Sequence, residues 1–91
     1  MFDVTNNEAA HRYELRVDGA IAIAAYRRED DVVVFTHTEV PQPLEGKGIG
    51  SRLIAAALED VRRRGLKMLP QCEFVAAYIE RHPDTQDLVA A

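Results

Sequence analysis

The spacing of the apolar residues changes once along this chain, close to Pro41. Before that point, apolar and polar residues alternate, as in residues 13–17, or β-branched residues gather in a short run, as in residues 32–40. Both patterns are typical of strands. From Ile49 onward, apolar residues recur every three or four positions, which is typical of an amphipathic helix. Strands followed by helices predict an α+β domain.

The order of the elements also predicts how the strands pair. The first three strands are joined by tight connections, such as Asp18-Gly19, and are therefore antiparallel. A helix between the third and fourth strands makes those two parallel. We expect a mixed sheet of three antiparallel strands and then one parallel strand after a helical crossover, with two helices packed against it. The expected strands are 13–17, 20–26, 32–40 and 66–69, the expected helices are 48–64 and about 74–82, and 86–91 is a tail of uncertain structure.

Length and charge narrow the classes of partner. The 91 residues suffice for one hydrophobic core, so we expect a single domain over residues 1–91. A net charge of −4 does not favour binding to a phosphate backbone. The basic triplet 62–64 falls in the expected last turn of the first helix, where cations complement the helix dipole. No apolar run approaches the ~20 residues of a membrane span. We therefore expect neither a nucleic-acid partner nor a membrane partner.

Cysteine and histidine content bears on compartment and metal binding. The single cysteine, Cys72, cannot form an internal disulfide, and the first residues carry neither a basic stretch nor a long apolar run. These features indicate a reducing compartment and no secretory signal, so we expect a cytoplasmic protein. The three histidines and the cysteine lack the spacing of metal ligands, so no metal is expected.

Three alternating glycines, Gly46, Gly48 and Gly50, stand between the third strand and the first helix. Without side chains there, backbone N–H groups and the positive end of the helix dipole can approach a phosphate. The spacing is not that of a Walker A loop, which needs Gly-x-x-x-x-Gly-Lys and then Ser or Thr. It also differs from the Gly-x-Gly-x-x-Gly dinucleotide fingerprint, which requires a parallel unit.

Residues 45–50 resemble the pyrophosphate loop of the GNAT (GCN5-related) acyltransferases, whose motif is Gln or Arg, two residues, Gly, one residue, and Gly or Ala. Gly48 and Gly50 match this motif, whereas Glu45 stands in the Gln/Arg position. Further segments in the same order are similar to the minimal-length, GNAT-like predicted N-acetyltransferases, over about residues 11–85. These segments are 37–41, 46–50, 65–67, 70–75, Tyr78 and 82–83.

The resemblance implies a fold, a cosubstrate and a reaction. Acetyl-CoA would lie in a cleft between residues 37–41 and 69–73, where the two parallel strands diverge. Main-chain groups near Glu39 and Val40 would pair with the pantetheine arm, and the N–H groups of residues 46–51 would hold the pyrophosphate. The acetyl group would pass to an amine, on a small molecule or a protein lysine. The implied cosubstrate-binding residues are Val40, Gly46, Lys47, Gly48, Ile49, Gly50 and Ser51.

Two residues on the third expected strand are candidates for general acid–base catalysis. Acetyl transfer requires a deprotonated amine, and His37 and Glu39 lie two apart on a strand and so share one face. The imidazole and the carboxylate would act as base and orienting partner. The alternative is an exposed strand glutamate beside a histidine of the core.

Cys72 and Tyr78 are the other catalytic candidates. Cys72 precedes the second helix, whose N-terminus can activate a thiol as a nucleophile. It would either carry the acetyl group, with His37 as its base, or only line the thioester while the amine attacks directly. The alternative is a small buried apolar residue. The resemblance implies that Tyr78 protonates the departing thiolate, and the alternative is packing against the sheet.

A rival class is a non-catalytic module that binds acyl-CoA or another protein. Larger members of the superfamily have helices between their first strands, whereas this chain has a plain hairpin there, so the acceptor site is shallow or completed by a partner. Glu45 also favours the rival, because its carboxylate would weaken pyrophosphate binding. A third class, a phosphate-loop nucleotide binder, would prefer ATP or NAD. A chain this short would gain stability from homodimer formation.

Overall fold

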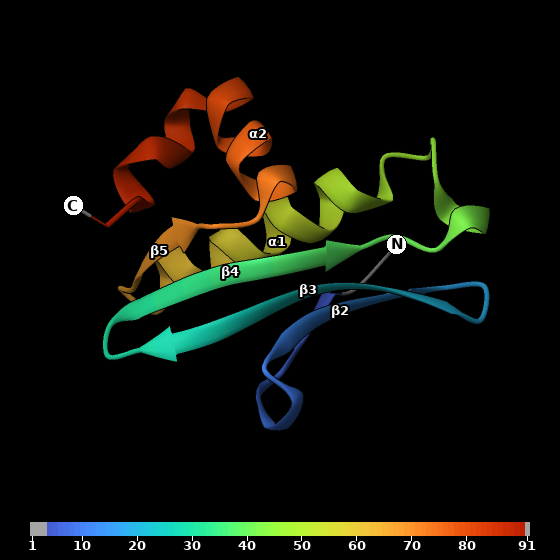
Figure 1. Cartoon of the computed structure of the whole chain (residues 1–91), viewed down its shortest axis with the longest axis horizontal. Helices are drawn as coiled ribbons and strands as arrows, with labels where there is room; N and C mark the ends of the chain where they lie inside the picture. The colour runs from blue at the N-terminus through green and yellow to red at the C-terminus, as the bar shows by residue number, and fades with distance from the viewer. Residues whose placement is uncertain (1–3, 91) are drawn as a thin grey trace.

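The computed structural model describes residues 4–90 and consists of one mixed sheet with helices on one of its faces (Figure 1). The sheet has the order β1-β2-β3-β4-β5. Its strands are β1 (Val4–Asn7), β2 (Arg12–Val17), β3 (Ala20–Glu29), β4 (Val32–Glu39) and β5 (Lys67–Pro70). The helices are α1 (Ile49–Arg63) and α2 (Glu73–Arg81), with short 3-10 turns η1 (Glu8–Ala10), η2 (Gln42–Leu44) and η3 (Pro83–Leu88).

The pairing confirms the mixed sheet and corrects its size. Strands β1 to β4 are antiparallel, and β4 pairs with β5 in parallel after the α1 crossover. The sequence predicted three antiparallel strands, and the structure has four. The missed strand, β1, reads Val-Thr-Asn-Asn, which is too short and too polar to show an alternating pattern. It lies at the edge of the sheet with β2 as its strand partner, and it also contacts α1 and accepts a hydrogen bond from Tyr26 at Asn6.

Two further boundaries differ from the sequence prediction. Strand β3 runs to Glu29, because the charged residues 27–29 continue the pairing with β4 at an exposed end of the sheet. The segment left as an uncertain tail forms η3 and then returns to the sheet. There Val89 bridges to Met68, and the N–H of Ala90 donates to the Met68 carbonyl at 2.8 Å, which covers part of the outer edge of β5.

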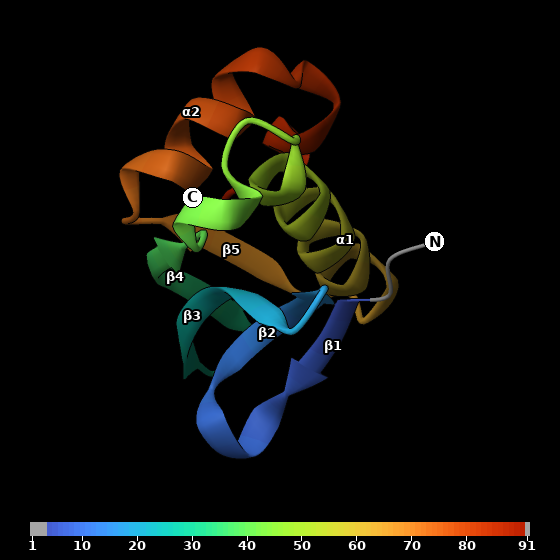
Figure 2. The ribbon, with the colours of Figure 1, turned by 90° about the vertical axis from the view of Figure 1, so that its right-hand side faces the viewer.

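The core lies between the sheet and the two helices. Alternate residues of β2 and β3 face α1, and Ala22 and Ala24 are fully buried there, so their small side chains let α1 pack closely on the sheet. Figure 2 shows α1 lying along the curved sheet, with the green segment that precedes it in front. Each large buried side chain contributes about 1.5–3 kcal/mol to folding. The largest fully buried side chains are Phe35, Leu15, Leu53, Ile54, Met68, Val34, Val61 and Val75.

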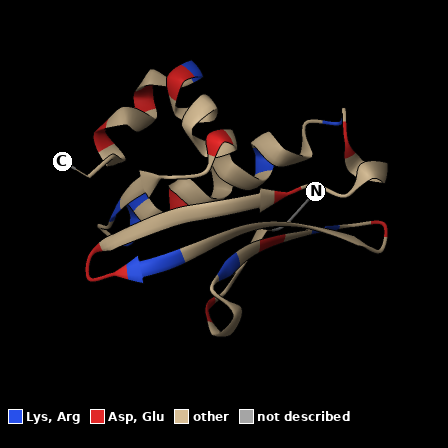
Figure 3. Ribbon diagram, viewed as in Figure 1, with Lys and Arg blue, Asp and Glu red and all other residues tan. Residues whose placement is uncertain are grey.

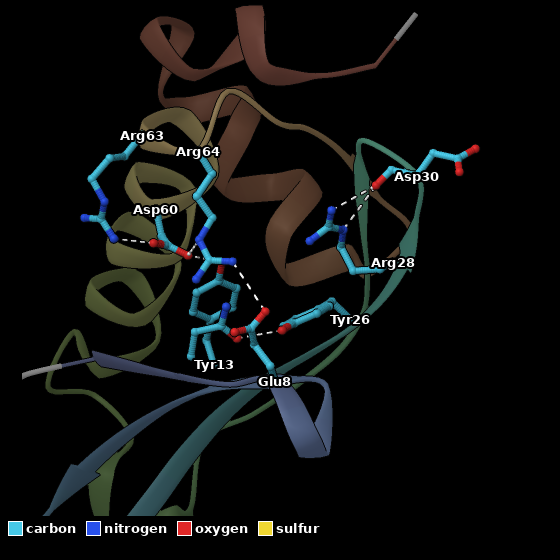
Figure 4. Close-up of polar contacts among 9 residues, drawn as sticks. Glu8, Tyr13, Tyr26, Arg28, Asp30, Asp60, Arg63 and Arg64 are labelled. Atoms are coloured by element: carbon cyan, nitrogen blue, oxygen red, sulfur yellow. Dashed lines mark hydrogen bonds and ion pairs between the residues drawn. The ribbon is translucent and has the colours of Figure 1, made fainter.

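One buried polar network ties η1 and β2 to the end of α1 (Figure 4). The hydroxyl of Tyr13 donates to Asp60 Oδ2 at 2.7 Å, and Asp60 also pairs with Arg63 and Arg64. Arg64 reaches Glu8 Oε1 at 3.5 Å. Burial, followed by the hydrogen bond and charge of Asp60, raises the pKa of Tyr13 far above its usual range. Two residues of the basic triplet therefore hold the fold together through Asp60.

Charges of both signs are spread over the ribbon (Figure 3). Over residues 4–90, no helix combines the length and the apolar character that crossing a membrane would need.

Candidate functional site

The parallel strands β4 and β5 separate partway along their length. They pair from Val32 opposite Lys67 to Phe35 opposite Pro70, and the N–H of Cys72 then donates to the Phe35 carbonyl at 3.0 Å. Beyond that point β4 continues to Glu39 with β3 as its partner, while the chain that follows β5 turns into α2. One side of the second half of β4 therefore has no strand partner.

A β-bulge bends β4 at the same place. Tyr26 of β3 lies opposite Phe35, but the next residue, Ala25, lies opposite His37, so Thr36 is an extra residue on β4. A bulge of this kind increases the local twist and turns a strand out of its ladder. The bulge and the end of the β4–β5 pairing thus coincide.

The glycine segment leads directly into α1. Gly46 and Gly48 have φ of 79° and 73°, a left-handed conformation that favours glycine. Gly48 caps α1 without any side-chain hydrogen bond. The first N–H groups of α1 have no partner within the helix and point out of its N-terminus. The start of α1 directly after Gly48 agrees with the helix that the sequence predicts from residue 48.

Two adjoining hollows, which share three lining residues, lie between the end of β4 and the start of α1, and we call them together the β4–α1 groove. The larger hollow, about 590 Å³, lies beside the end of β4, and the smaller, about 260 Å³, lies at the glycine segment. Both are lined by Val40, Glu45 and Phe74. Ile21, Thr38, Glu39 and Pro41 complete the larger, and Leu44, Gly46, Gly48, Ile49, Gly50, Ser51 and Arg81 complete the smaller.

Phe74 is the large hydrophobic residue that the described chain leaves most open to solvent, at 37%. Its ring lies over the first turn of α1, because a Cβ built on Gly50 would come within 2.5 Å of the ring carbon Cζ. Glycine at position 50 therefore has a packing reason that is separate from backbone conformation. The sequence analysis identified the glycine but not the aromatic ring that requires it.

His37 and Glu39 lie together, as the strand alternation predicts. His37 Nε2 is 3.7 Å from Glu39 Oε2, and both side chains are more than half exposed. Glu39 lines the larger hollow, whereas His37 does not. The pair is therefore at the edge of the groove and open to solvent.

Cys72 lies on the other face of β4 from His37. Its Sγ is 3.3 Å from Thr38 Oγ1, and neighbouring strand residues point to opposite faces. Cys72 is half-buried and stands at the N-cap of α2. The structure brings Cys72 to Thr38, a residue that the sequence analysis did not single out, and it does not bring Cys72 to His37.

Tyr78 is not among the residues that line the groove. It is buried, and its ring stacks on His82 with centroids 3.8 Å apart. It lines a separate hollow of about 280 Å³ between α1 and η3, together with Leu58 and Leu88. Burial, and then the charge of Asp84, raises the pKa of Tyr78. These contacts are with His82, α1 and η3, whereas the alternative stated for Tyr78 was packing against the sheet.

Residues 4–90 contain no group of three or more His, Cys, Asp or Glu side chains placed to hold a metal ion. The groove is lined by the glycine segment and the start of α1, whose N–H groups suit an anion, and also by the carboxylates of Glu39 and Glu45.

Comparison with known proteins identifies the family. The family model for GCN5-related N-acetyltransferases matches residues 12–88. This chain therefore belongs to the GCN5-related N-acetyltransferase (GNAT) family. The solution structure of a GCN5-like candidate N-acetyltransferase from Staphylococcus aureus is similar over 98% of this chain and 88% of that one, with a TM-score of 0.75 and 26% identity.

Animal relatives named NATD1 are also similar. The human protein is 37% identical over 57 residues, which cover 63% of this chain and 50% of the relative. The Xenopus tropicalis protein is 28% identical over 89 residues, covering 93% of this chain and 81% of the relative. In the first of these matches, as in those to the chicken and mouse proteins, the chain spans about half the length of the relative.

Proposed function

We propose that this chain is an acetyl-CoA-dependent N-acetyltransferase that acetylates an amine, on a small molecule or a protein lysine. One observation carries the proposal: the β4–α1 groove joins the end of β4, where the pairing with β5 has stopped, to the N-terminus of α1. A thioester with a long polar arm and a pyrophosphate needs both features, the first for the amides of the arm and the second for the phosphates.

Acetyl-CoA would enter as a substrate along this groove. The N–H groups of residues 46–51 would bind the pyrophosphate, with Lys47 adding positive charge beside them. The main chain around Val40 would pair with the pantetheine arm, because no strand competes for those groups on that side. Phe74 would then contact the arm where the two hollows meet.

Transfer would proceed by direct attack of the amine. The amine nitrogen forms a bond to the thioester carbonyl carbon, the C–S bond breaks, and the thiolate leaves. Glu39, which reaches the groove, accepts the proton of the amine, and His37 orients the Glu39 carboxylate. Cys72 would support Thr38, which lines the groove, rather than carry the acetyl group, since Cys72 itself lines neither hollow and His37 lies on the opposite face of β4 from its thiol.

Calorimetry with acetyl-CoA tests the binding part of the proposal. Ser51→Glu adds an anion to the first turn of α1, where it favours the helix but repels a phosphate. We expect saturable binding by the wild type and at least a tenfold loss in Ser51→Glu. Ala9→Glu, at an exposed position on η1, carries the same charge change and should bind normally. Equal affinity in all three proteins would contradict this placement of the pyrophosphate.

Turnover separates the enzyme from the non-catalytic acyl-CoA module. Glu45, which lines both hollows, is the observation that favours the module, because it places a carboxylate beside the proposed phosphates. Release of CoA thiol is measured with a panel of amines for the wild type and His37→Ala. An enzyme shows amine-dependent release that falls in the variant while acetyl-CoA affinity is kept. Binding without release for every amine would support the module.

A further inference from the structure

The glycine segment of this chain follows an acidic residue, whereas the family motif has a neutral or a basic residue at that position. Where the GNAT motif has Gln or Arg, this chain has Glu45, which lines the smaller hollow next to Gly46 and Gly48. A carboxylate there opposes a bound anion at close range. Lys47, the cation within the glycine segment, is not among the residues that line this hollow, so a cation on the hollow itself has to come from another element.

Arg81, in the last turn of α2, lines the same hollow. It stands 31 positions after Gly50 in the sequence, and only the packing of α2 beside α1 brings the two together. Glu45 and Arg81 both border the hollow, yet they form no ion pair with each other.

The guanidinium of Arg81 differs from the others in being unpaired. Among residues 4–90 it has no hydrogen bond or ion pair, whereas seven other arginines are held by an acidic side chain or a carbonyl. Those seven are Arg12, Arg16, Arg27, Arg28, Arg62, Arg63 and Arg64. Arg81 thus keeps its full set of donors for a ligand at the hollow.

We infer that Arg81 binds the pyrophosphate of the cosubstrate and supplies there the positive charge that an Arg at position 45 would supply. The inference rests on the proposed function and adds a residue to it. A guanidinium presents paired N–H donors that match two phosphate oxygens, and backbone N–H groups of α1 supply the opposite side. The helix would thus bind one face of the anion and Arg81 another.

The test compares three ligands in calorimetry: acetyl-CoA, 3′-dephospho-acetyl-CoA and acetyl-pantetheine. Arg81→Gln should weaken the first two about equally, by about tenfold, and leave the third unchanged, because only the third lacks the pyrophosphate. A loss for acetyl-CoA alone would assign Arg81 to the 3′-phosphate and overturn the inference. A loss for all three would overturn it as well, since it would indicate a structural effect.

A rescue variant provides the sharper criterion. Glu45→Arg restores the family residue, so the double variant Glu45→Arg/Arg81→Gln should regain the affinity lost in Arg81→Gln. Arg16→Gln, on β2 and 71% exposed, is the matched charge control and should bind all three ligands normally. If the double variant binds acetyl-CoA as weakly as Arg81→Gln does, an arginine at position 45 cannot replace Arg81, and the inference is contradicted.

Inorganic pyrophosphate separates this inference from the proposed function. If the wild type fails to bind acetyl-CoA, the proposed function is wrong. A titration with pyrophosphate then still tests whether Arg81 binds this anion. Pyrophosphate binding that Arg81→Gln weakens supports the anion site. Pyrophosphate binding that is the same in both proteins, or absent in both, overturns it.

Discussion

The ring of Phe74 occupies the space that a Cβ at position 50 would need, with Cζ only 2.5 Å from that point. The contact joins the start of α2 to the first turn of α1, directly above the smaller hollow. Any side chain at position 50 therefore has to displace the ring before it disturbs the helix, because the ring end is the movable partner.

The first prediction concerns Gly50→Ala. Alanine favours a helix over glycine by about 1 kcal/mol, and the Phe74 ring is partly exposed and able to turn away. We expect the melting temperature to change little while acetyl-CoA affinity falls, because the displaced ring reshapes the groove. Thermal unfolding and calorimetry measure the two quantities.

Phe74→Ala removes the ring and serves as the control for Gly50→Ala. In the double variant Gly50→Ala/Phe74→Ala, the alanine at position 50 meets no ring, so it should add no affinity loss beyond that of Phe74→Ala alone. If the affinity losses of Gly50→Ala and Phe74→Ala add up fully in the double variant, displacement of the ring is not the reason why Gly50→Ala binds acetyl-CoA less tightly.

The second prediction concerns Glu45→Gln. This change places a residue of the family motif in its slot and removes a negative charge from both hollows. We expect acetyl-CoA affinity to rise several-fold at low salt, and the gain to shrink as added salt screens the charge. Calorimetry at two salt concentrations measures it. Glu29→Gln, at the exposed end of β3, carries the same charge change and should leave affinity unaltered. An equal gain in affinity in both variants would show that the net charge of the protein, and not the carboxylate at position 45, is responsible.

The sequence predicted the parts of this fold whose signals are local. Alternation located β2, β3 and β4, the helical period located α1, and the glycines located its start at Gly48. Strand β1 was not predicted, because its short sequence shows no alternation of apolar and polar residues and it forms a strand only by pairing with β2. The same holds for the candidate site: the residue spacing in the sequence pointed to Glu39 and to the glycine segment, which both line the groove.

Other site residues depend on how distant elements pack. Thr38 meets Cys72 across 34 positions, and Arg81 reaches the glycine segment only through the placement of α2 beside α1. Tyr78 was assigned from its distance along the family pattern, and a helix rotates its side chains by about 100° per residue. A shift of one position is therefore enough to turn a side chain from the groove to the packed side of α2.

The third prediction concerns Tyr13 and pH. Because the folded state raises the pKa of Tyr13, folding favours the protonated phenol. The resulting stability is fully present below the unfolded pKa, 10.0, and is lost as pH rises above it. We expect the free energy of unfolding to fall above about pH 10, and to fall less steeply in Tyr13→Phe. Urea unfolding at a series of pH values measures both slopes.

At neutral pH the same variant loses one buried hydrogen bond to Asp60. We expect a cost of about 1 kcal/mol, because Arg63 and Arg64 still satisfy the carboxylate. Asp60→Ala should cost more, about 3 kcal/mol, since it leaves the Tyr13 hydroxyl without its acceptor and removes the partner of two arginines. A smaller loss in Asp60→Ala than in Tyr13→Phe would contradict the network described here.

The fourth prediction separates the two roles considered for Tyr78. Its ring packs against His82 and lines a hollow away from the groove, so its hydroxyl has no access to a departing thiolate there. We expect Tyr78→Phe to keep the turnover rate within about twofold and Tyr78→Ala to lower the melting temperature, as loss of a buried aromatic costs about 3–5 kcal/mol. A large fall in turnover for Tyr78→Phe, with unchanged stability, would restore it as the acid.

The last prediction concerns Cys72 and decides between direct transfer and an acetyl-cysteine. If the amine attacks the thioester directly, Cys72→Ala keeps measurable turnover, and rapid quenching followed by mass spectrometry finds no acetylated wild-type protein. Thr38→Val tests the neighbouring contact, since it removes the hydroxyl 3.3 Å from the thiol while keeping the side-chain shape. We expect Thr38→Val and Cys72→Ala to lower turnover to a similar degree, because each removes the same contact and neither removes a group that carries the acetyl. An acetyl group found on Cys72, together with complete loss of turnover in Cys72→Ala, would establish the covalent route instead.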